Sequence, residues 1–394
     1  MLSKRRYLII TKGFNFLTNL CLMNRVWTEI DFNALRSNVE LSARTVGKDV
    51  GITAVVKADA YGHGAVEISR KLAKLPPVVM LGVSSVEEGL EIRESGVSAP
   101  VLVMGVTQDC LVADAVKAGL TLSVFTENCL NSLSKAAKKS GKKVEYHLKI
   151  DTGMARLGAT REDVFDLMEK ARTLPGLNLA GVFTHFAHSS ASEPEPTFKQ
   201  IAEFNSVVSD LENSGVRPYF KHMANSAAIQ RFSESFGNMV RPGIMLYGSS
   251  FEKNGLAPVM KVKTSVVRIR KIGAGKPIGY GGTFKTKKSS LLATIPVGYK
   301  DGYYRSLSNR ARVSVNGVSV PVVGEVCMDF TTLDITGVPQ VKIGDEVILF
   351  GGEGIFVEDV AQWAGTIPYE IMTLIGGKVR VRISNEPAEP HQEN

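Results

Sequence analysis

Short apolar runs alternate with longer amphipathic segments between residues 52 and 241. This order is typical of strand–helix units arranged around a parallel sheet. The apolar runs predict eight strands, at residues 53–57, 79–83, 101–104, 121–125, 145–150, 179–185, 219–223 and 239–241. The segments between them have helical periodicity and caps, as in the stretch that Thr126 opens and Gly141 ends. Eight such units favour an α/β protein with an N-terminal (β/α)8 TIM-like barrel over an open doubly wound sheet.

The pattern changes after about residue 261, where the helical periodicity is lost. Segments rich in Val, Ile and Thr predict strands at residues 264–271, 291–296, 311–315, 318–322 and 341–350. Asn316-Gly317 is a hairpin signal between two of them, and residues 357–364 predict a short last helix. We expect a barrel over 33–260, a C-terminal, mainly β domain over 261–385, a strand at 25–32 that pairs into the β domain, and a disordered tail at 386–394.

Residues 1–24 form an extension of uncertain status. The basic residues Lys4, Arg5 and Arg6 precede a short apolar run, as in a secretory signal. Lys12 interrupts that run, however, and no A-x-A cleavage site follows it. Because Met23 lies just before the first predicted strand, the preferred interpretation is an upstream extension or a misplaced start.

Composition and charge narrow the class of protein. The 394 residues are 44% hydrophobic and 22% charged, which is typical of a globular enzyme of about two domains. Half of the formal charge of +8 lies in the first 24 residues, and the lysine cluster at 138–143 has no interleaved aromatic residues, so we expect no nucleic-acid partner. Four distant cysteines indicate neither a disulfide framework nor a zinc site, and no apolar run could span a membrane. A cytoplasmic protein without a metal is expected.

Polar residues recur where the predicted strands end, which is the face at which barrels bind ligands. They are Lys57, Arg156, His185, Asn225, Ser226 and Arg241. An amine such as that of Lys57, held in a partly apolar pocket, has a lowered pKa and can form a Schiff base; the alternative is a lysine that only packs along a strand end. The turns at 224–226 and 241–244 combine small residues with free backbone N–H groups that could hold a phosphate. The motifs of dinucleotide, P-loop and HExxH metal sites are absent from the sequence.

Eight segments resemble the alanine racemases, a pyridoxal-phosphate-dependent family with a barrel fold. In chain order they are AVVKADAYGHG, KIDTGMARLG, THFAHS, HMANSAA, RPGIMLYG, GYGGTF, VGYKDGYYR and VGEVCMDF, within residues 26–381. The resemblance implies that Lys57 carries pyridoxal 5′-phosphate as a Schiff base. It assigns the cofactor's phosphate to Tyr61, Ser226, Gly243, Ile244 and Tyr369, and the rest of the cofactor pocket to Arg156, His185, Asn225 and Arg241. Lys149 would be carbamylated and orient Arg156, unless it is a plain salt-bridging lysine.

The same resemblance implies how an amino acid is racemised. Arg241, oriented by His222, would face the pyridine nitrogen and leave it unprotonated, because an arginine does not give up its proton. The substrate, bound as an external aldimine, would exchange its α-proton with Lys57 on one face and Tyr280 on the other. His185 and Arg241 would stabilise charge near Tyr280.

A homodimer is implied in which Tyr280 and Met328 reach the partner's site. Substrate contacts would come from Arg156, Met328 and Tyr280, with Asp329, Tyr299 and Arg305 further out along the path into the pocket. Glu325 departs from the family, in which many members have arginine, and this puts the substrate preference in doubt.

The expected activity is interconversion of L- and D-alanine, supplying D-alanine for peptidoglycan. Three alternatives remain open. A related racemase would act on serine or another small amino acid. A barrel-type decarboxylase would have an acid in place of Arg241, and a non-catalytic pyridoxal-phosphate carrier would lack the β domain.

Overall fold

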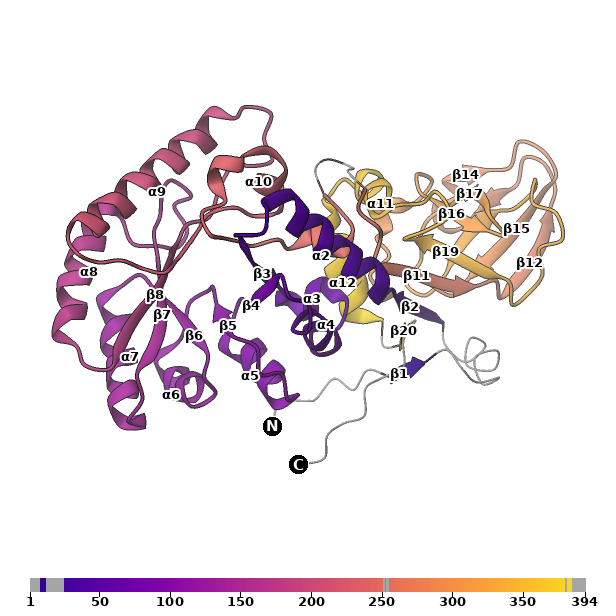
Figure 1. The fold of residues 1–394 in the computed structure, drawn as a ribbon. Helices are drawn as coiled ribbons and strands as arrows, with labels where there is room; N and C mark the ends of the chain where they lie inside the picture. Colours follow the sequence, from indigo (N-terminus) through magenta and orange to yellow (C-terminus); the bar gives the residue numbers. More distant parts are fainter. Residues whose placement is uncertain (1–7, 12–24, 251, 253–254, 380, 385–394) are drawn as a thin grey trace.

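The computed structural model describes residues 8–11, 25–250, 252, 255–379 and 381–384. A barrel of parallel strands and helices occupies one end of an elongated molecule, and a mainly β region occupies the other (Figure 1). No helix in the described ranges is long and apolar enough to cross a membrane.

Eight parallel strands form the barrel in the order β10-β3-β4-β5-β6-β7-β8-β9. Their bounds are β3 (Gly51–Val55), β4 (Val78–Val83), β5 (Val101–Val103), β6 (Thr121–Val124), β7 (Val144–Lys149), β8 (Leu177–Phe183), β9 (Phe220–His222) and β10 (Met239–Val240). The backbone N–H of Arg241 donates to the Ala224 carbonyl at 2.9 Å, which joins the ends of β9 and β10. The predicted barrel class is therefore confirmed.

Helices follow the strands around the outside of the barrel (Figure 1). They are α2 (Phe32–Val46), α3 (Lys57–Gly62), α4 (Ala65–Leu72), α5 (Val86–Glu94), α6 (Asp109–Lys117), α7 (Glu127–Ser140), α8 (Arg161–Thr173), α9 (Glu195–Asn213) and α10 (Ser226–Arg231), with the 3-10 turns η1 (Ser233–Ser235) and η2 (Ile244–Tyr247). The Thr126 hydroxyl accepts from the Cys129 N–H at the start of α7, and Gly141 ends that helix in a left-handed conformation. The predicted capping of this helix is confirmed.

Two strands, β3 and β8, end two residues earlier than predicted. Lys57 does not end a strand: β3 stops at Val55, and Lys57 begins α3, because the backbone turns at Val56 and is left-handed from Ala58 onward. His185 does not close a strand either, since β8 stops at Phe183, after which the Thr184 N–H bonds to the His222 carbonyl of β9. Both side chains still lie just beyond a strand's carboxyl end.

The mainly β region contains a seven-stranded sheet in the order β1-β20-β2-β11-β19-β16-β17, a sheet β12-β15-β18 and a pair β13-β14. The bounds are β1 (Leu8–Thr11), β2 (Val26–Ile30), β11 (Met260–Ser265), β12 (Arg268–Ile272), β13 (Pro277–Ile278), β14 (Phe284–Lys285), β15 (Ser290–Ile295), β16 (Arg312–Val315), β17 (Val318–Pro321), β18 (Thr331–Asp334), β19 (Glu346–Phe350) and β20 (Val381–Ser384), with 3-10 turns η3 (Tyr280–Gly282), η4 (Tyr299–Asp301) and η5 (Arg305–Leu307). Strand β2 pairs antiparallel with β11 and parallel with β20.

The single strand predicted at 264–271 is wrong, because the chain changes sheets there. The Val266 N–H bonds to Asp345 beside β19, whereas the Val267 N–H bonds to Thr294 of β15. The chain thus leaves one sheet as β11 and enters another as β12. The Asn316-Gly317 hairpin is present, with φ of 50° and 76° at the two residues that join β16 to β17.

Two helices, not one, precede the end of the described chain. Helix α11 (Val357–Ala364) has the predicted bounds, but α12 (Pro368–Lys378) and β20 follow it. Helix α12 lies between the barrel and the β region and packs against α3 (Figure 1). A Cβ built on Gly376 would lie 2.2 Å from the Gly62 carbonyl oxygen, so this packing requires glycine. The predicted tail at 386–394 and most of the 1–24 extension lie outside the described residues.

Candidate functional site

Lys57 lies on an unusual turn at the carboxyl end of the barrel. The four residues after it, none of them glycine, have φ between 52° and 55°. Left-handed backbone costs non-glycine residues about 1–2 kcal/mol each, and such strain gathers at functional sites. The Glu88 carboxylate supports the turn by accepting from the Ala58 N–H at 2.7 Å, while its other oxygen accepts from the Ser84 N–H at 2.7 Å. The turn is thus held from outside by a side chain of α5.

The environment of Lys57 favours a neutral, nucleophilic amine. Burial lowers the pKa of Lys57 below its usual value, and the charge of Arg156 lowers it further against an opposing effect of Glu88. An amine of this kind can attack a carbonyl group.

Lys149 is a second buried lysine, at the end of β7. Its side chain lies 5.3 Å above the Phe183 ring and donates to the Met104 carbonyl at 3.1 Å. Burial, together with the charges of Arg241, Arg156 and Lys57, lowers the pKa of Lys149 to about 8. The charges of Lys57, Lys149, Arg156 and Arg241 therefore act on one another at the carboxyl end of the barrel.

Arg241 is only 3% exposed, and both of its Nη atoms are hydrogen-bonded. Its guanidinium donates to the carbonyls of Thr184, His222 and Met223 at 2.6–2.9 Å, and to Nδ1 of His222 at 2.8 Å. Burial lowers the pKa of Arg241 to about 9, which still leaves it protonated at neutral pH. The predicted contact between His222 and Arg241 is present.

His147 extends this contact and was not found by sequence reasoning. Because Arg241 donates to Nδ1 of His222, the proton of His222 is on Nε2, which donates to Nδ1 of His147 at 2.8 Å. Burial, together with the charge of Arg241, lowers the pKa of His147 to about 3. His147 sits in the mostly buried strand β7, where the sequence has no signal beyond its side-chain type.

His185 lies beside the same cations. Burial, together with the charges of Arg241, Arg156 and Lys149, lowers the pKa of His185 to about 3. At neutral pH its imidazole is therefore uncharged and can accept as well as donate a proton.

A cradle of hydrogen-bond donors forms where α10 and η2 begin. Asn225 caps α10 through the Ala228 N–H, and the Ser226 hydroxyl accepts from the Gly243 N–H at 2.9 Å. A Cβ on Gly243 would lie 2.4 Å from the Tyr61 hydroxyl oxygen, so glycine lets that hydroxyl approach the backbone. The Tyr61 ring lies 5.8 Å from that of Tyr369 on α12. The residues assigned to a phosphate by resemblance thus meet here, with Ile244 following Gly243 at the start of η2.

The remaining predicted residues lie in the β region. Tyr280, Tyr299 and Met328 are 72%, 41% and 53% exposed. No hydrogen bond or ring contact among the described residues joins Tyr280 or Met328 to the Lys57 pocket. Arg305 is paired with Glu325 at 2.8 Å, so the two charges partly offset each other at this surface.

Known proteins resemble this chain in both sequence and fold. The family described as alanine racemase, N-terminal domain, matches residues 30–251, and alanine racemase, C-terminal domain, matches residues 259–383. The alanine racemase of Thermodesulfovibrio yellowstonii is 44% identical over 356 residues, which cover 90% of this chain and 95% of that one.

Solved structures agree. Alanine racemase from D-cycloserine producing Streptomyces lavendulae matches with a TM-score of 0.88 and 32% identity, over 94% of this chain and 99% of that one. Alanine racemase from Bartonella henselae with covalently bound pyridoxal phosphate matches with a TM-score of 0.81 and 30% identity, over 91% and 99%. With both domain families matched over nearly all of its length, this chain belongs to the alanine racemase family.

Proposed function

We propose that this protein interconverts L- and D-alanine with pyridoxal 5′-phosphate bound to Lys57. The observation that carries the proposal is the joint presence, at the carboxyl end of the barrel, of a lysine with a lowered pKa, the buried Arg241 and the cradle at Ser226 and Gly243. The Bartonella henselae relative, described with covalently bound pyridoxal phosphate, supports the same cofactor here.

The donor set fits the cofactor's anionic phosphate. Hydroxyl groups of Tyr61, Ser226 and Tyr369 and the N–H groups of Gly243 and Ile244 would hold it, as dense donors at a helix start favour anions. Arg156 would contact the ring oxygen, and His185 and Asn225 would line the rest of the pocket.

Pyridoxal phosphate acidifies the α-proton of a bound amino acid by delocalising the negative charge that its removal leaves. Arg241, held by three carbonyls and His222, would face the ring nitrogen as a donor and leave it unprotonated. That limits how far the charge spreads, which favours return of a proton over loss of carbon dioxide or transamination. Racemisation is thereby favoured over the decarboxylase alternative.

Inversion needs a proton donor on each face of the substrate. Lys57 would serve one face and Tyr280 of a second subunit the other, in a head-to-tail homodimer. Exposure of Tyr280, Met328 and Phe330, at 72%, 53% and 48%, supports a partner that covers this surface. Arg156, Met328 and Tyr280 would contact the substrate.

Lys149 would be carbamylated. A pKa of about 8 leaves part of the amine neutral and able to add carbon dioxide, and the product would carry a negative charge among the surrounding cations. Its carboxylate-like head would then orient Arg156. Mass analysis of the peptide that contains Lys149, prepared without acid, should detect the adduct; a crystal structure with a bare Lys149 amine would remove the idea.

The side-chain pocket, bounded by Tyr280 and Tyr369, would admit about a methyl group, so alanine is the proposed substrate and serine the nearest alternative. D-alanine made in the cytoplasm would supply peptidoglycan.

The test is incubation of the cofactor-loaded protein with L-alanine in deuterated water, followed by chiral separation and mass analysis. D-alanine with deuterium at the α-carbon is expected. Amine plus carbon dioxide would instead indicate a decarboxylase, and no exchange would contradict the proposal. Tyr280→Phe should slow exchange by at least about a hundredfold while cofactor absorbance stays unchanged, because general acid–base groups contribute on that scale.

A further inference from the structure

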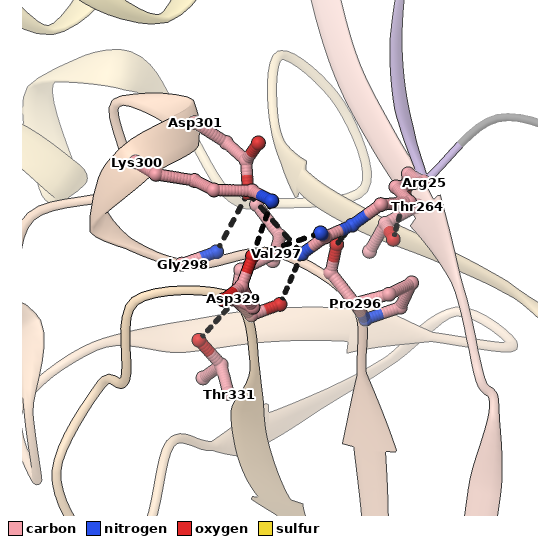
Figure 2. Close-up of polar contacts among 9 residues, drawn as sticks. All are labelled: Arg25, Thr264, Pro296, Val297, Gly298, Lys300, Asp301, Asp329 and Thr331. Carbon is pink, nitrogen blue, oxygen red and sulfur yellow. Dashed lines mark hydrogen bonds and ion pairs between the residues drawn. The ribbon is translucent and has the colours of Figure 1, made fainter.

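Arg25 directly precedes strand β2, and its side chain reaches across to the segment that carries Met328 and Asp329. Figure 2 shows its guanidinium between Asp329 and the end of strand β15. Nη1 lies 2.9 Å from the Asp329 carboxylate, Nη2 donates to the Asp329 backbone carbonyl, and Nε donates to the Pro296 carbonyl at 3.1 Å. One side chain thus ties together three separate stretches of sequence.

The backbone of Arg25 is itself anchored. Its carbonyl accepts from the Thr264 hydroxyl on β11, in the strand that pairs with β2 (Figure 2). Its guanidinium also lies 5.6 Å from the centre of the Phe330 ring, a cation–π distance. The backbone of Arg25 is therefore held by the seven-stranded sheet, and its side chain contacts residues 329 and 330.

The segment at residues 327–330 is also hydrogen-bonded to η4. The Tyr299 N–H bonds to the Cys327 carbonyl at 3.1 Å, and the Lys300 N–H bonds to the Met328 carbonyl at 3.2 Å. The Lys300 ammonium pairs with the same Asp329 carboxylate. Gly298 permits this contact, because a Cβ there would lie 2.2 Å from the Cys327 carbonyl oxygen. Of the side-chain contacts named so far, those of Arg25 join residues 327–330 and η4 to the start of β2.

We propose that Arg25 is a positioning residue that holds the backbone around Met328 and Asp329, together with Tyr299, in the orientation needed to complete the active site of the partner subunit. This inference rests on the proposed function, in which that segment lines the partner's substrate pocket. Arginine suits the task because its planar fork donates in several fixed directions, whereas a lysine ammonium cannot span Asp329 and Pro296 together.

Kinetics should separate positioning from general stability. A displaced pocket wall weakens contacts made equally in the ground and transition states, which raises KM and leaves kcat largely unchanged. We expect Arg25→Ala to raise KM for L-alanine about tenfold and to change kcat less than about threefold. Arg25→Lys should recover only part of the loss. Arg312→Ala is the matched control, since the Arg312 side chain donates twice to Ser319 within its own hairpin, and this variant should leave KM unchanged.

Mixed dimers test whether the effect acts across the interface. Arg25→Ala is co-expressed with Lys57→Ala under two different affinity tags, and the doubly tagged dimer is purified. Its one working site combines the intact Lys57 of one chain with the intact Arg25 of the other, so KM should return to the wild-type value. A dimer of wild type with the double variant Arg25→Ala/Lys57→Ala should keep the raised KM.

An unchanged KM in the Arg25→Ala homodimer, or a raised KM in the first mixed dimer, would overturn the proposal. Wild-type protein without racemase activity would instead contradict the proposed function, so the two failures are distinguishable.

Discussion

At the scale of single residues, a chain of hydrogen bonds sets the protonation of two buried histidines. Arg241 has no acceptor atom, so its bond to Nδ1 of His222 fixes that ring as an acceptor there and a donor at Nε2. His147 must then accept at Nδ1, and it is neutral because its pKa is about 3. The orientation of Arg241 therefore depends on the imidazole of His147, to which it is linked by two successive hydrogen bonds.

This neutrality predicts how stability depends on pH. In the unfolded chain His147 has a pKa of about 6.5, so below that value the unfolded state binds a proton that the folded state excludes. The free energy of unfolding should fall as pH drops from about 6.5 toward about 3, by roughly 1.4 kcal/mol per pH unit for this group. Urea unfolding at about pH 7 and about pH 5 measures the fall.

His147→Gln keeps an acceptor for His222 and removes the titration, so its stability should fall less steeply with acidification than that of the wild type. His188→Gln, at an exposed position, is the control and should retain the wild-type slope. Equal slopes for all three proteins would show that His147 contributes nothing to the acid response.

Residue types alone located part of this site. Lys57 and Arg241 stand out because a charged side chain follows an apolar run, which is a pattern visible in the sequence. His147 gives no such signal, since its role depends on contact with His222, a residue on another strand. Tyr369 was reached only through the family resemblance, because nothing in its local sequence distinguishes it from a surface tyrosine.

At the scale of elements, helices α3 and α12 approach each other through glycine. The Gly62 and Gly376 backbones touch, and this contact brings Tyr61 of one helix near Tyr369 of the other. The left-handed turn of α3 is thereby supported by α12 on one side and by Glu88 on the other.

Two neighbouring glycines of α12 test this packing. Gly376→Ala should lower the free energy of unfolding by about 1–3 kcal/mol, because the new methyl group would meet the Gly62 backbone and force the helices apart. Gly377→Ala meets no atom within 4 Å and should be neutral or stabilising by up to about 1 kcal/mol. Chemical unfolding measures the free energy of unfolding of both variants. Equal free energies would argue against a tight contact between Gly62 and Gly376.

Elements with a strong periodic signal could be predicted, and elements fixed by distant contacts could not. The eight barrel strands follow from apolar runs, and the β16–β17 hairpin follows from Asn316-Gly317. Helix α12 was missed because Gly376 and Gly377 weaken its helical pattern. The turn at Ala58–Tyr61 contradicts local preference, so no rule of propensity would place it.

At the scale of the whole molecule, the barrel and the β region share one continuous hydrophobic core. The surface that carries Tyr280 and Met328 nevertheless stays exposed in the single chain. If a partner subunit must supply Tyr280, activity depends on association.

Specific activity should therefore fall on dilution, in step with the loss of dimer. Sedimentation velocity and racemase assays over the same range of protein concentrations would compare the two, and restoring the concentration should restore activity. A monomer with full activity would contradict the shared site.

Strand β2 has a further consequence for how the chain is made. It emerges from the ribosome near the start of synthesis, but its partners β11 and β20 begin at Met260 and Val381. At about 5–20 residues per second, β2 waits roughly 10–50 s for β11 while the whole barrel is being synthesised. During that interval its backbone N–H and C=O groups are an open edge that the same strand of a neighbouring nascent chain could pair with. Slower translation or crowded polysomes would lengthen this exposure, so the nascent chain, more than the finished enzyme, is the form most in need of a chaperone.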